Sequence, residues 1–144
     1  MSQWHQQFAE QMESLFAQSS TGFERFADEV IEPVFESVSA FLARWHYEAS
    51  CPPSETPRRV YRFGLTEDGY LLIWFRLSGL DTVECEYEYS LPHVGRVNGV
   101  RTTGSLRAAE SEWVESCFQM ALNNFVSKFI DAGQRRHAEQ PALV

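Results

Sequence analysis

The sequence holds only three cysteines, a single lysine and no long apolar run among its 144 residues. Cys51, Cys85 and Cys117 are an odd number and their spacing fits no metal or redox motif, so they predict no disulfide framework. The longest apolar run, residues 71–75, is far too short to span a bilayer. The first residues also lack the basic and apolar parts of a signal peptide. These absences predict a cytoplasmic protein that is not associated with a membrane.

Positive charge is scarce, and the net charge is −8. Such a charge opposes binding to nucleic acid or anionic lipid. Residues 1–50 carry eight acids and two arginines, whereas residues 51–107 carry seven of each. The arginines of the middle region could form a basic strip beside aromatic residues, as in single-strand nucleic-acid binders. The acidic front opposes this, and we expect no nucleic-acid partner. The arginines of that strip are Arg58, Arg59, Arg62, Arg96, Arg101 and Arg107.

Catalytic motifs are missing as well. The sequence has no His-Glu-x-x-His, no paired Cys-x-x-Cys and no glycine-rich phosphate loop. Cys51 and His46 are the only thiol and imidazole close together in the sequence. Nucleophilic catalysis needs a rigidly positioned base, and Cys51 stands in a proline-containing linker. We therefore predict no enzymatic activity, no cofactor and no metal site.

The two ends of the chain show helical periodicity. Apolar residues recur on one stripe over residues 3–17 and again from residue 23 to 45. Thr21 and Glu24 have the spacing of a capping box, which predicts that a second helix begins there. Pro33 lies inside that helix and should kink or split it. A C-terminal helix is predicted over residues 105–132, because its apolar stripe ends before Gly133, and residues 133–144 are expected to be loose.

The middle of the chain has the alternation of β-strands. A linker at residues 51–57 precedes a predicted antiparallel sheet over residues 58–104. Thr-Glu-Asp-Gly at residues 66–69 joins the first two strands, and Asn98-Gly99 predicts a type I′ hairpin between strands at about 94–97 and 100–104. The element order is α-α-β-β-β-β-β-α. It predicts one α+β domain in two layers, an antiparallel meander of about five strands with long helices before and after it.

The register of two strands follows from their side chains. Strand 70–77 is apolar on both faces, and strand 82–90 has Val, Cys and Tyr on one face and glutamates on the other. Pairing the apolar sides gives one uniform core face and sets arginines beside glutamates on the second face. A slip of one residue would set the glutamates against the apolar core residues, which excludes the alternative.

The second face of this sheet has an apolar centre with a charged rim, as interaction surfaces do. Its glutamates repeat at about 6.8 Å along the strand, too far apart to hold one cation without further ligands. A pair of such carboxylates could suit glycoside hydrolysis, but acids on a strand face are more often solvated or paired with arginine. The predicted interaction-surface residues are Arg62, Leu72, Trp74, Arg76, Glu84, Glu86 and Glu88.

Helix length completes the prediction. Each long helix should run roughly 40 Å, whereas an eight-residue strand covers about 26 Å. An apolar helix that overhangs the sheet needs a cover, and a second copy of the chain is the simplest one. In element order and acidity the chain resembles small dimeric type III secretion chaperones, although these have a helix where this sequence has only Leu91-Pro92-His93. The resemblance implies a chaperone-like function.

We therefore predict a non-enzymatic protein-binding or chaperone-like homodimer, with a further protein as a possible partner. The alternative is a small-molecule carrier that holds an apolar ligand between the sheet and the C-terminal helix. The ligand-cavity candidates for that alternative are Tyr61, Trp74, Trp113 and Phe118.

Overall fold

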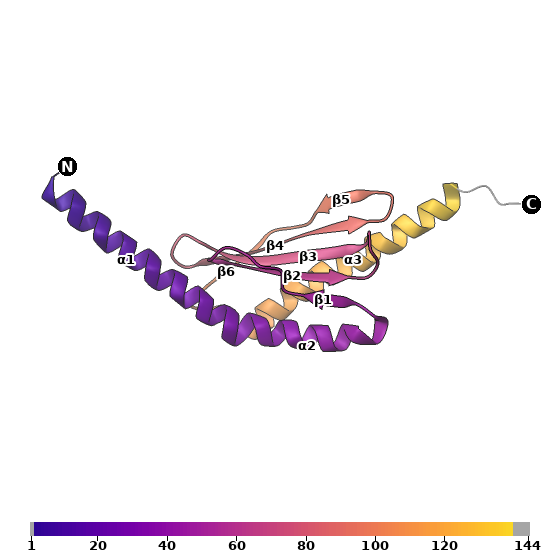
Figure 1. The fold of residues 1–144 in the computed structure, drawn as a ribbon, viewed down its shortest axis with the longest axis horizontal. Coiled ribbons are helices and arrows are strands. Elements are labelled where there is room, and N and C mark those ends of the chain that lie inside the picture. Colours follow the sequence, from indigo (N-terminus) through magenta and orange to yellow (C-terminus); the bar gives the residue numbers. More distant parts are fainter. Residues whose placement is uncertain (1, 140–144) are drawn as a thin grey trace, which may run out of the picture.

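The computed structural model describes residues 2–139, with side chains up to residue 134. A long N-terminal helical segment is followed by six strands and a C-terminal helix. The helices lie on one side of the sheet and leave its other face without a helix (Figure 1). This arrangement confirms the predicted α+β class, with two layers and an antiparallel meander.

The N-terminal segment is helical without a break from residue 3 to residue 42. It consists of α1 (Gln3–Phe26), a π-helical turn (Ala27–Ile31) and α2 (Glu32–Leu42). The predicted helix start at Thr21 is wrong, because Thr21 is an exposed residue inside α1. Gly22 weakens a helix by about 1 kcal/mol, and Leu106 packs beside it, with its Cδ2 at an ordinary contact distance of 3.6 Å from where a Cβ would lie.

Pro33 bends this helical segment without splitting it. A proline has no N–H to donate to the carbonyl four residues earlier, so a regular α-helix cannot continue through it unchanged. The structure accommodates Pro33 with the π-helical turn just before it, where the N–H of Glu32 donates to the carbonyl of Ala27, five residues back. The direction of the helix changes at this turn, so α1 and α2 point along different lines (Figure 1).

The meander begins with four strands. They are β1 (Glu48–Ser50), β2 (Arg58–Gly64), β3 (Tyr70–Ser78) and β4 (Thr82–Leu91), and each pairs antiparallel with the next. The turn at residues 66–69 joins β2 to β3, with hydrogen bonds between Thr66 and Gly69. β1 was not predicted, because its three residues follow the helical front directly and precede the linker.

The last two strands contradict the predicted hairpin. β5 (Gly95–Asn98) pairs with the C-terminal half of β4, and β6 (Thr102–Ser105) pairs with the N-terminal half of β4. They lie in line along the same edge of β4 and do not pair with each other. Asn98-Gly99 is therefore an interruption of an edge strand. The ten-residue length of β4 allows this, and Gly99 fits because a Cβ there would collide with the ring of Tyr87.

The C-terminal helix α3 (Ser111–Glu139) begins later and ends later than predicted. Residues 105–110 form a turn in which Ser105 Oγ donates a hydrogen bond to Asp81 Oδ2 at 2.7 Å. Gly133 does not stop the helix, because no Cβ contact or positive φ is needed at this position and the helix tolerates it. The predicted loose tail, residues 133–144, is thus helical to residue 139, and its remainder lies outside the described residues.

The core lies between the sheet and the helices. The rings of Phe35, Tyr61, Phe63, Phe75 and Phe118 pack within 6.4 Å of one another's centroids in several pairs. Cys85 and Cys117, predicted to be core residues, are both buried. Aromatic packing of this density leaves the helix-facing side of the sheet filled.

Candidate interaction surfaces

The helix-free face of the sheet carries all seven residues of the predicted interaction surface. The register predicted for β3 and β4 is confirmed, with Leu72 opposite Glu88, Trp74 opposite Glu86 and Arg76 opposite Glu84. Arg62 lies opposite Leu72 from the β2 side. The surface is therefore a grid of three rows across β2, β3 and β4.

Glu84 is the electrostatic centre of this grid. Its residue is only 8% exposed, although it lies on the face without helices. Arg76 holds one of its carboxylate oxygens at 2.6 Å, and Arg101 approaches the other at 3.7 Å. A carboxylate removed from water is stable only when it is paired in this way, so the three residues form one unit.

Trp74 is less available than the sequence suggests. It is half-buried, and the guanidinium of Arg58 lies 5.1 Å from the centroid of its ring. Leu72 is also half-buried, and Arg62 stacks on Tyr70 at 4.6 Å. The apolar centre is thus partly covered by arginine side chains from this same chain.

The first part of α1 is the most exposed apolar surface. Figure 1 shows that this segment, residues 3–20, which we call the α1 arm, projects past the end of the sheet. Trp4 is 62% exposed and Phe8 is 55% exposed, and Leu15 and Phe16 are exposed as well. This stripe was predicted as an apolar helix face, and the projection of the helix beyond the sheet leaves it uncovered.

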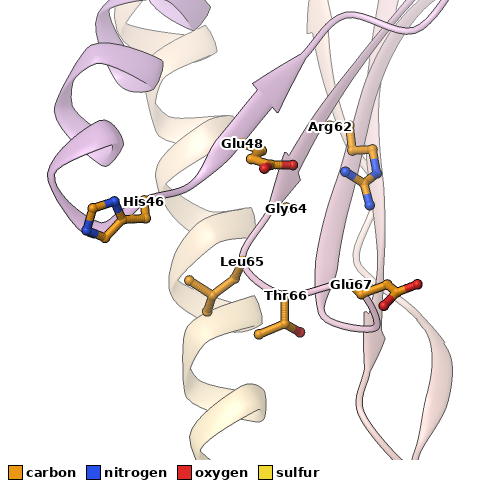
Figure 2. Close-up of a pocket in the computed structure, with 7 residues that line it drawn as sticks. All are labelled: His46, Glu48, Arg62, Gly64, Leu65, Thr66 and Glu67. Atoms are coloured by element: carbon orange, nitrogen blue, oxygen red, sulfur yellow. The ribbon is translucent and has the colours of Figure 1, made fainter.

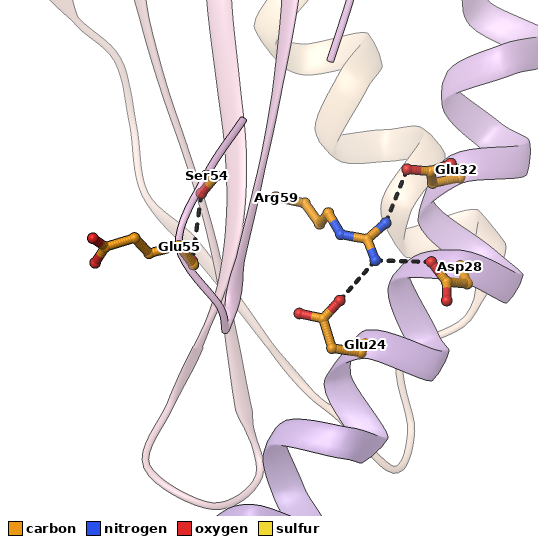
Figure 3. Close-up of polar contacts among 6 residues, drawn as sticks. All are labelled: Glu24, Asp28, Glu32, Ser54, Glu55 and Arg59. Carbon is orange, nitrogen blue, oxygen red and sulfur yellow. Dashed lines mark hydrogen bonds and ion pairs between the residues drawn. The ribbon is translucent and has the colours of Figure 1, made fainter. Parts of the chain in front are cut away.

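A cluster that the sequence did not reveal joins the helix to the sheet. Arg59, on the helix-facing side of β2, reaches three acids spaced four residues apart (Figure 3). Its nitrogens lie 2.7 Å from Glu24, 2.8 Å from Asp28 and 2.9 Å from Glu32. Burial lowers the pKa of Arg59, but the hydrogen bonds and charges of Asp28 and Glu24 outweigh burial and raise the pKa above its ordinary value.

The signal for this cluster was present in the spacing of the acids. Residues four apart lie on one face of a helix, so Glu24, Asp28 and Glu32 form a row that can meet one basic side chain. Arg59 was predicted to belong to a basic strip, without a connection to these acids. In the structure the side chain of Arg59 lies on the helix-facing side of β2, whereas those of its strand neighbours Arg58 and Val60 lie on the other side.

The four ligand-cavity candidates do not come together. Trp74 lies on the helix-free face, opposite to Tyr61, which is on the helix-facing side of β2. Tyr61 and Phe118 are fully buried, and their rings pack at a centroid distance of 5.7 Å. Trp113 packs on Phe75 at 6.0 Å. The space that a ligand would need between these residues is filled by their own rings.

The thiol and imidazole candidates do not form a catalytic pair. Burial, and then the Glu32 carboxylate, raise the pKa of the Cys51 thiol, which disfavours the nucleophilic thiolate. His46 ends the 3-10 turn Ala43–Trp45 in a left-handed conformation, with φ 63°. No hydrogen bond joins the two side chains within the described residues.

His46 instead borders a hollow of about 370 Å³ at the turn between β2 and β3 (Figure 2). Glu48, Arg62 and Glu67 also line it, and His46 lies apart from Arg62 and Glu67 across the hollow. No hydrogen bond or ion pair links these lining side chains. The hollow has no positioned acid, base or nucleophile.

Across residues 2–134, for which side chains are described, no three His, Cys, Asp or Glu side chains gather as a metal site. In that same part of the chain, no helix combines the length and the apolar character needed to cross a bilayer. The chain matches no family model, and comparison with curated proteins and with solved structures finds no significant similarity.

Proposed function

We propose that the chain is a non-enzymatic, homodimeric protein-binding domain of the chaperone-like kind, and that two copies associate through their α1 arms. The observation that carries this proposal is the exposed stripe of the arm, on which Trp4, Phe8 and Phe16 are 62%, 55% and 47% exposed. The protein has two buried free cysteines and an exposed one, as proteins of a reducing compartment do, so we place it in the cytoplasm.

The stripe is separated from the charges of the arm. At 3.6 residues per turn, the apolar side chains fall within an arc of about 120°. Glu10 and Glu13 lie about 190° and 130° from the centre of that arc by the same geometry. Phe23 and Phe26, which are buried in the core, fall on the same side of the helix as the stripe. A partner on the stripe would therefore extend the core beyond the sheet.

The order of the stripe suits a two-fold contact between identical helices. Trp4, Phe8, Met12 and Phe16 are equally spaced, so an antiparallel pair centred between Phe8 and Met12 sets Trp4 against Phe16 of the other copy. The same contacts are then made in both directions, as a two-fold interface requires. Neither acid of the arm faces the contact.

The available area supports a dimer of moderate size. A large aromatic side chain buries about 150–250 Å² when it is fully covered. The remaining exposed parts of five large side chains thus offer several hundred Å² per copy, compared with about 800 Å² per partner in a standard interface. The adjoining ends of the domain would supply the rest, so we expect a reversible dimer.

The helix-free face of the sheet is the second candidate for the contact. Its Trp74 is half-buried under Arg58, and its buried carboxylate, that of Glu84, is already paired with Arg76. An interface there would have to displace these contacts, whereas the ring contacts of Trp4 in the α1 arm are with its neighbours His5 and Phe8 on the same helix. The arm is therefore favoured as the dimer contact.

Sedimentation velocity over a range of concentrations tests the proposal with three single variants. Phe8→Glu places a charge in the middle of the stripe and should leave the protein monomeric. Gln6→Glu adds the same charge to the opposite side of the same helix and should leave the dimer intact. Trp74→Glu, on the sheet, should also leave the dimer intact, and circular dichroism should show that all three variants keep the fold.

Two results would overturn the proposal. One is a wild-type protein that stays monomeric at about 100 µM, a concentration that populates contacts as weak as about −5.5 kcal/mol. The other is a dimer that resists Phe8→Glu but is dissociated by Trp74→Glu, which would move the contact to the sheet.

A further inference from the structure

A groove runs between α2 and α3, away from both surfaces described above. It consists of two adjoining hollows of about 720 and 310 Å³ that share Val38 and Glu115. Figure 1 shows that α2 and α3 diverge from a point near the π-helical turn, which opens the space between them. The groove is lined by apolar side chains from both helices: Val34, Val38, Phe41 and Leu42 from α2, and Leu122 and Val126 from α3.

The charged residues that line the groove have one sign, although the guanidinium of Arg44 lies beside one end, 5.3 Å from the ring centroid of Phe41. Glu29, Glu110 and Glu115 line it, and no arginine or lysine is among its lining residues. Arg25 partly neutralises Glu29 from the side, at 3.4 Å on an exposed part of the helix. Within the described residues, Glu110 and Glu115 take part in no ion pair. An apolar floor with an unneutralised acidic edge is complementary to a ligand that is apolar on one side and basic on the other.

We propose that this groove binds an amphipathic helix of a partner protein, with apolar residues on Val38, Leu122 and Val126 and with lysine or arginine residues along the edge formed by Glu110 and Glu115. The groove follows α3 from Ser111 to Val126, about 22 Å at 1.5 Å per residue, which fits a helix of about 15 residues. Binding of a helix in a groove relies on apolar side chains at helical spacing. This inference gives the protein-binding part of the proposed function a site, and rests on it.

The α1 arm of a second copy is a poor occupant of the same groove. The arm carries Glu10 and Glu13, and its chain has no arginine or lysine before Arg25. Its polar side would meet the acidic edge with acids of its own. The chemistry therefore favours a basic helix from a different protein over self-association at this site.

The test is a titration of the full-length protein with two labelled synthetic peptides, followed by fluorescence anisotropy. Both peptides have about 15 residues and the same leucine and alanine face, and their polar faces carry lysine in one and glutamate in the other. We expect the lysine peptide to bind about tenfold more tightly or better, and its affinity to fall with added salt because the charges are exposed.

Variants of the protein locate the bound peptide. Val126→Asp should abolish binding, whereas Met120→Asp, at an equally exposed position of α3 outside the groove lining, should not change it. Replacement of both Glu110 and Glu115 by glutamine should lower the affinity for the lysine peptide by about fivefold or more. The matched control neutralises Glu36 and Glu112, exposed acids that do not line the groove, and should leave the affinity unchanged.

Three outcomes would overturn the inference. Equal binding of the lysine and glutamate peptides would remove the charge argument. Loss of peptide binding in Phe8→Glu but not in Val126→Asp would place the peptide on the α1 arm. Displacement of the lysine peptide by a peptide of residues 1–20 would make the groove a contact between copies. Because the titration does not require α1 pairing, it can succeed or fail independently of the dimer experiment.

Discussion

Arg59 Nη2 lies 2.8 Å from Asp28 Oδ1, across the boundary between the sheet and the π-helical turn. Asp28 is inside the turn, with Glu24 in α1 and Glu32 at the start of α2. One guanidinium thus holds three successive segments of the helix against β2. This contact fixes the direction that the helix takes after Pro33 relative to the sheet. It therefore fixes the direction of the α1 arm as well.

Replacement of Arg59 by methionine should lower the free energy of unfolding by about 1–3 kcal/mol, a range between those of exposed and buried ion pairs. The loss follows because Glu24, Asp28 and Glu32 would then repel one another at spacings of four residues. Urea denaturation measures the change. Arg58→Met removes the same charge from the opposite face of β2 and should cost clearly less. Equal losses in the two variants would show that the cluster adds nothing specific.

Glu84→Gln should destabilise the fold by about 1–3 kcal/mol, because it leaves Arg76 and Arg101 without their carboxylate at a position that is only 8% exposed. Glu88→Gln is the control on the same face of β4, since Glu88 makes no ion pair within the described residues. Thermal unfolding of both variants gives the comparison. A Glu84 variant as stable as the Glu88 variant would contradict the central role given to this carboxylate.

Tyr61→Phe should leave stability at neutral pH unchanged or raise it by up to about 1–2 kcal/mol. The Tyr61 hydroxyl is buried and makes no hydrogen bond of good geometry, although the Arg59 guanidinium lies near it, and removing such a group relieves its desolvation cost. Tyr87→Phe is the contrast, because the Tyr87 hydroxyl accepts a hydrogen bond from Asn124 and its loss should destabilise the protein. Chemical denaturation at pH 7 distinguishes the two. A destabilised Tyr61 variant would reveal a partner for that hydroxyl.

The raised pKa of Tyr61 predicts that the fold becomes less stable at alkaline pH. Burial, and then the nearby Glu32 carboxylate, raise the pKa of Tyr61 well above its ordinary value of about 10. Above about pH 10 the Tyr61 hydroxyl therefore keeps its proton in the folded state but loses it in the unfolded chain. The contribution of Tyr61 to the free energy of unfolding is complete below about pH 10 and declines as the pH rises above that value. The decline should be smaller in Tyr61→Phe. Identical alkaline unfolding of variant and wild type would contradict this assignment.

Gly133→Ala should stabilise the protein by about 0.5–1 kcal/mol, because Gly133 lies inside α3 with open space around it. Gly79 also has open space, but its φ is +68°, so Gly79→Ala should destabilise. Thermal unfolding and helix content by circular dichroism report both changes. No gain for Gly133→Ala would indicate that α3 ends before this residue.

The sequence predicted the sheet register because alternation acts over a whole strand. A slip of β4 by one residue would have brought Glu84, Glu86 and Glu88 against Phe75, Ile73 and Leu71, and no local preference can offset that. Such arguments sum over many residues and depend little on any single one. The exposure of the α1 arm did not follow from the sequence, because residues 3–17 were predicted as a separate helix and the comparison of helix length with strand length concerned the longer helices.

Local signals were less reliable. Thr21 with Glu24 favoured a cap and Asn98 with Gly99 favoured a hairpin, and both signals were overruled by contacts with distant residues, whereas Gly133 favoured a stop that the helix does not need. Leu106 packs at Gly22, the full length of β4 pairs with two strands at once, and Glu24 is held by Arg59. A contact between residues 35 positions apart, such as that of Glu24 with Arg59, cannot be read from a short stretch of sequence.

The interruption between β5 and β6 affects how copies of this chain can meet. An unbroken edge strand offers its free N–H and C=O groups to any other strand, which promotes aggregation by strand addition. Here one edge of the sheet is formed by two four-residue strands separated at residues 99–101, and the other by the three residues of β1 and the first four residues of β2, which β1 leaves unpaired. Both edges are too short to template a long ladder. The large apolar surface that this protein exposes on its α1 arm is therefore helical, whereas its sheet edges offer only short stretches for strand addition.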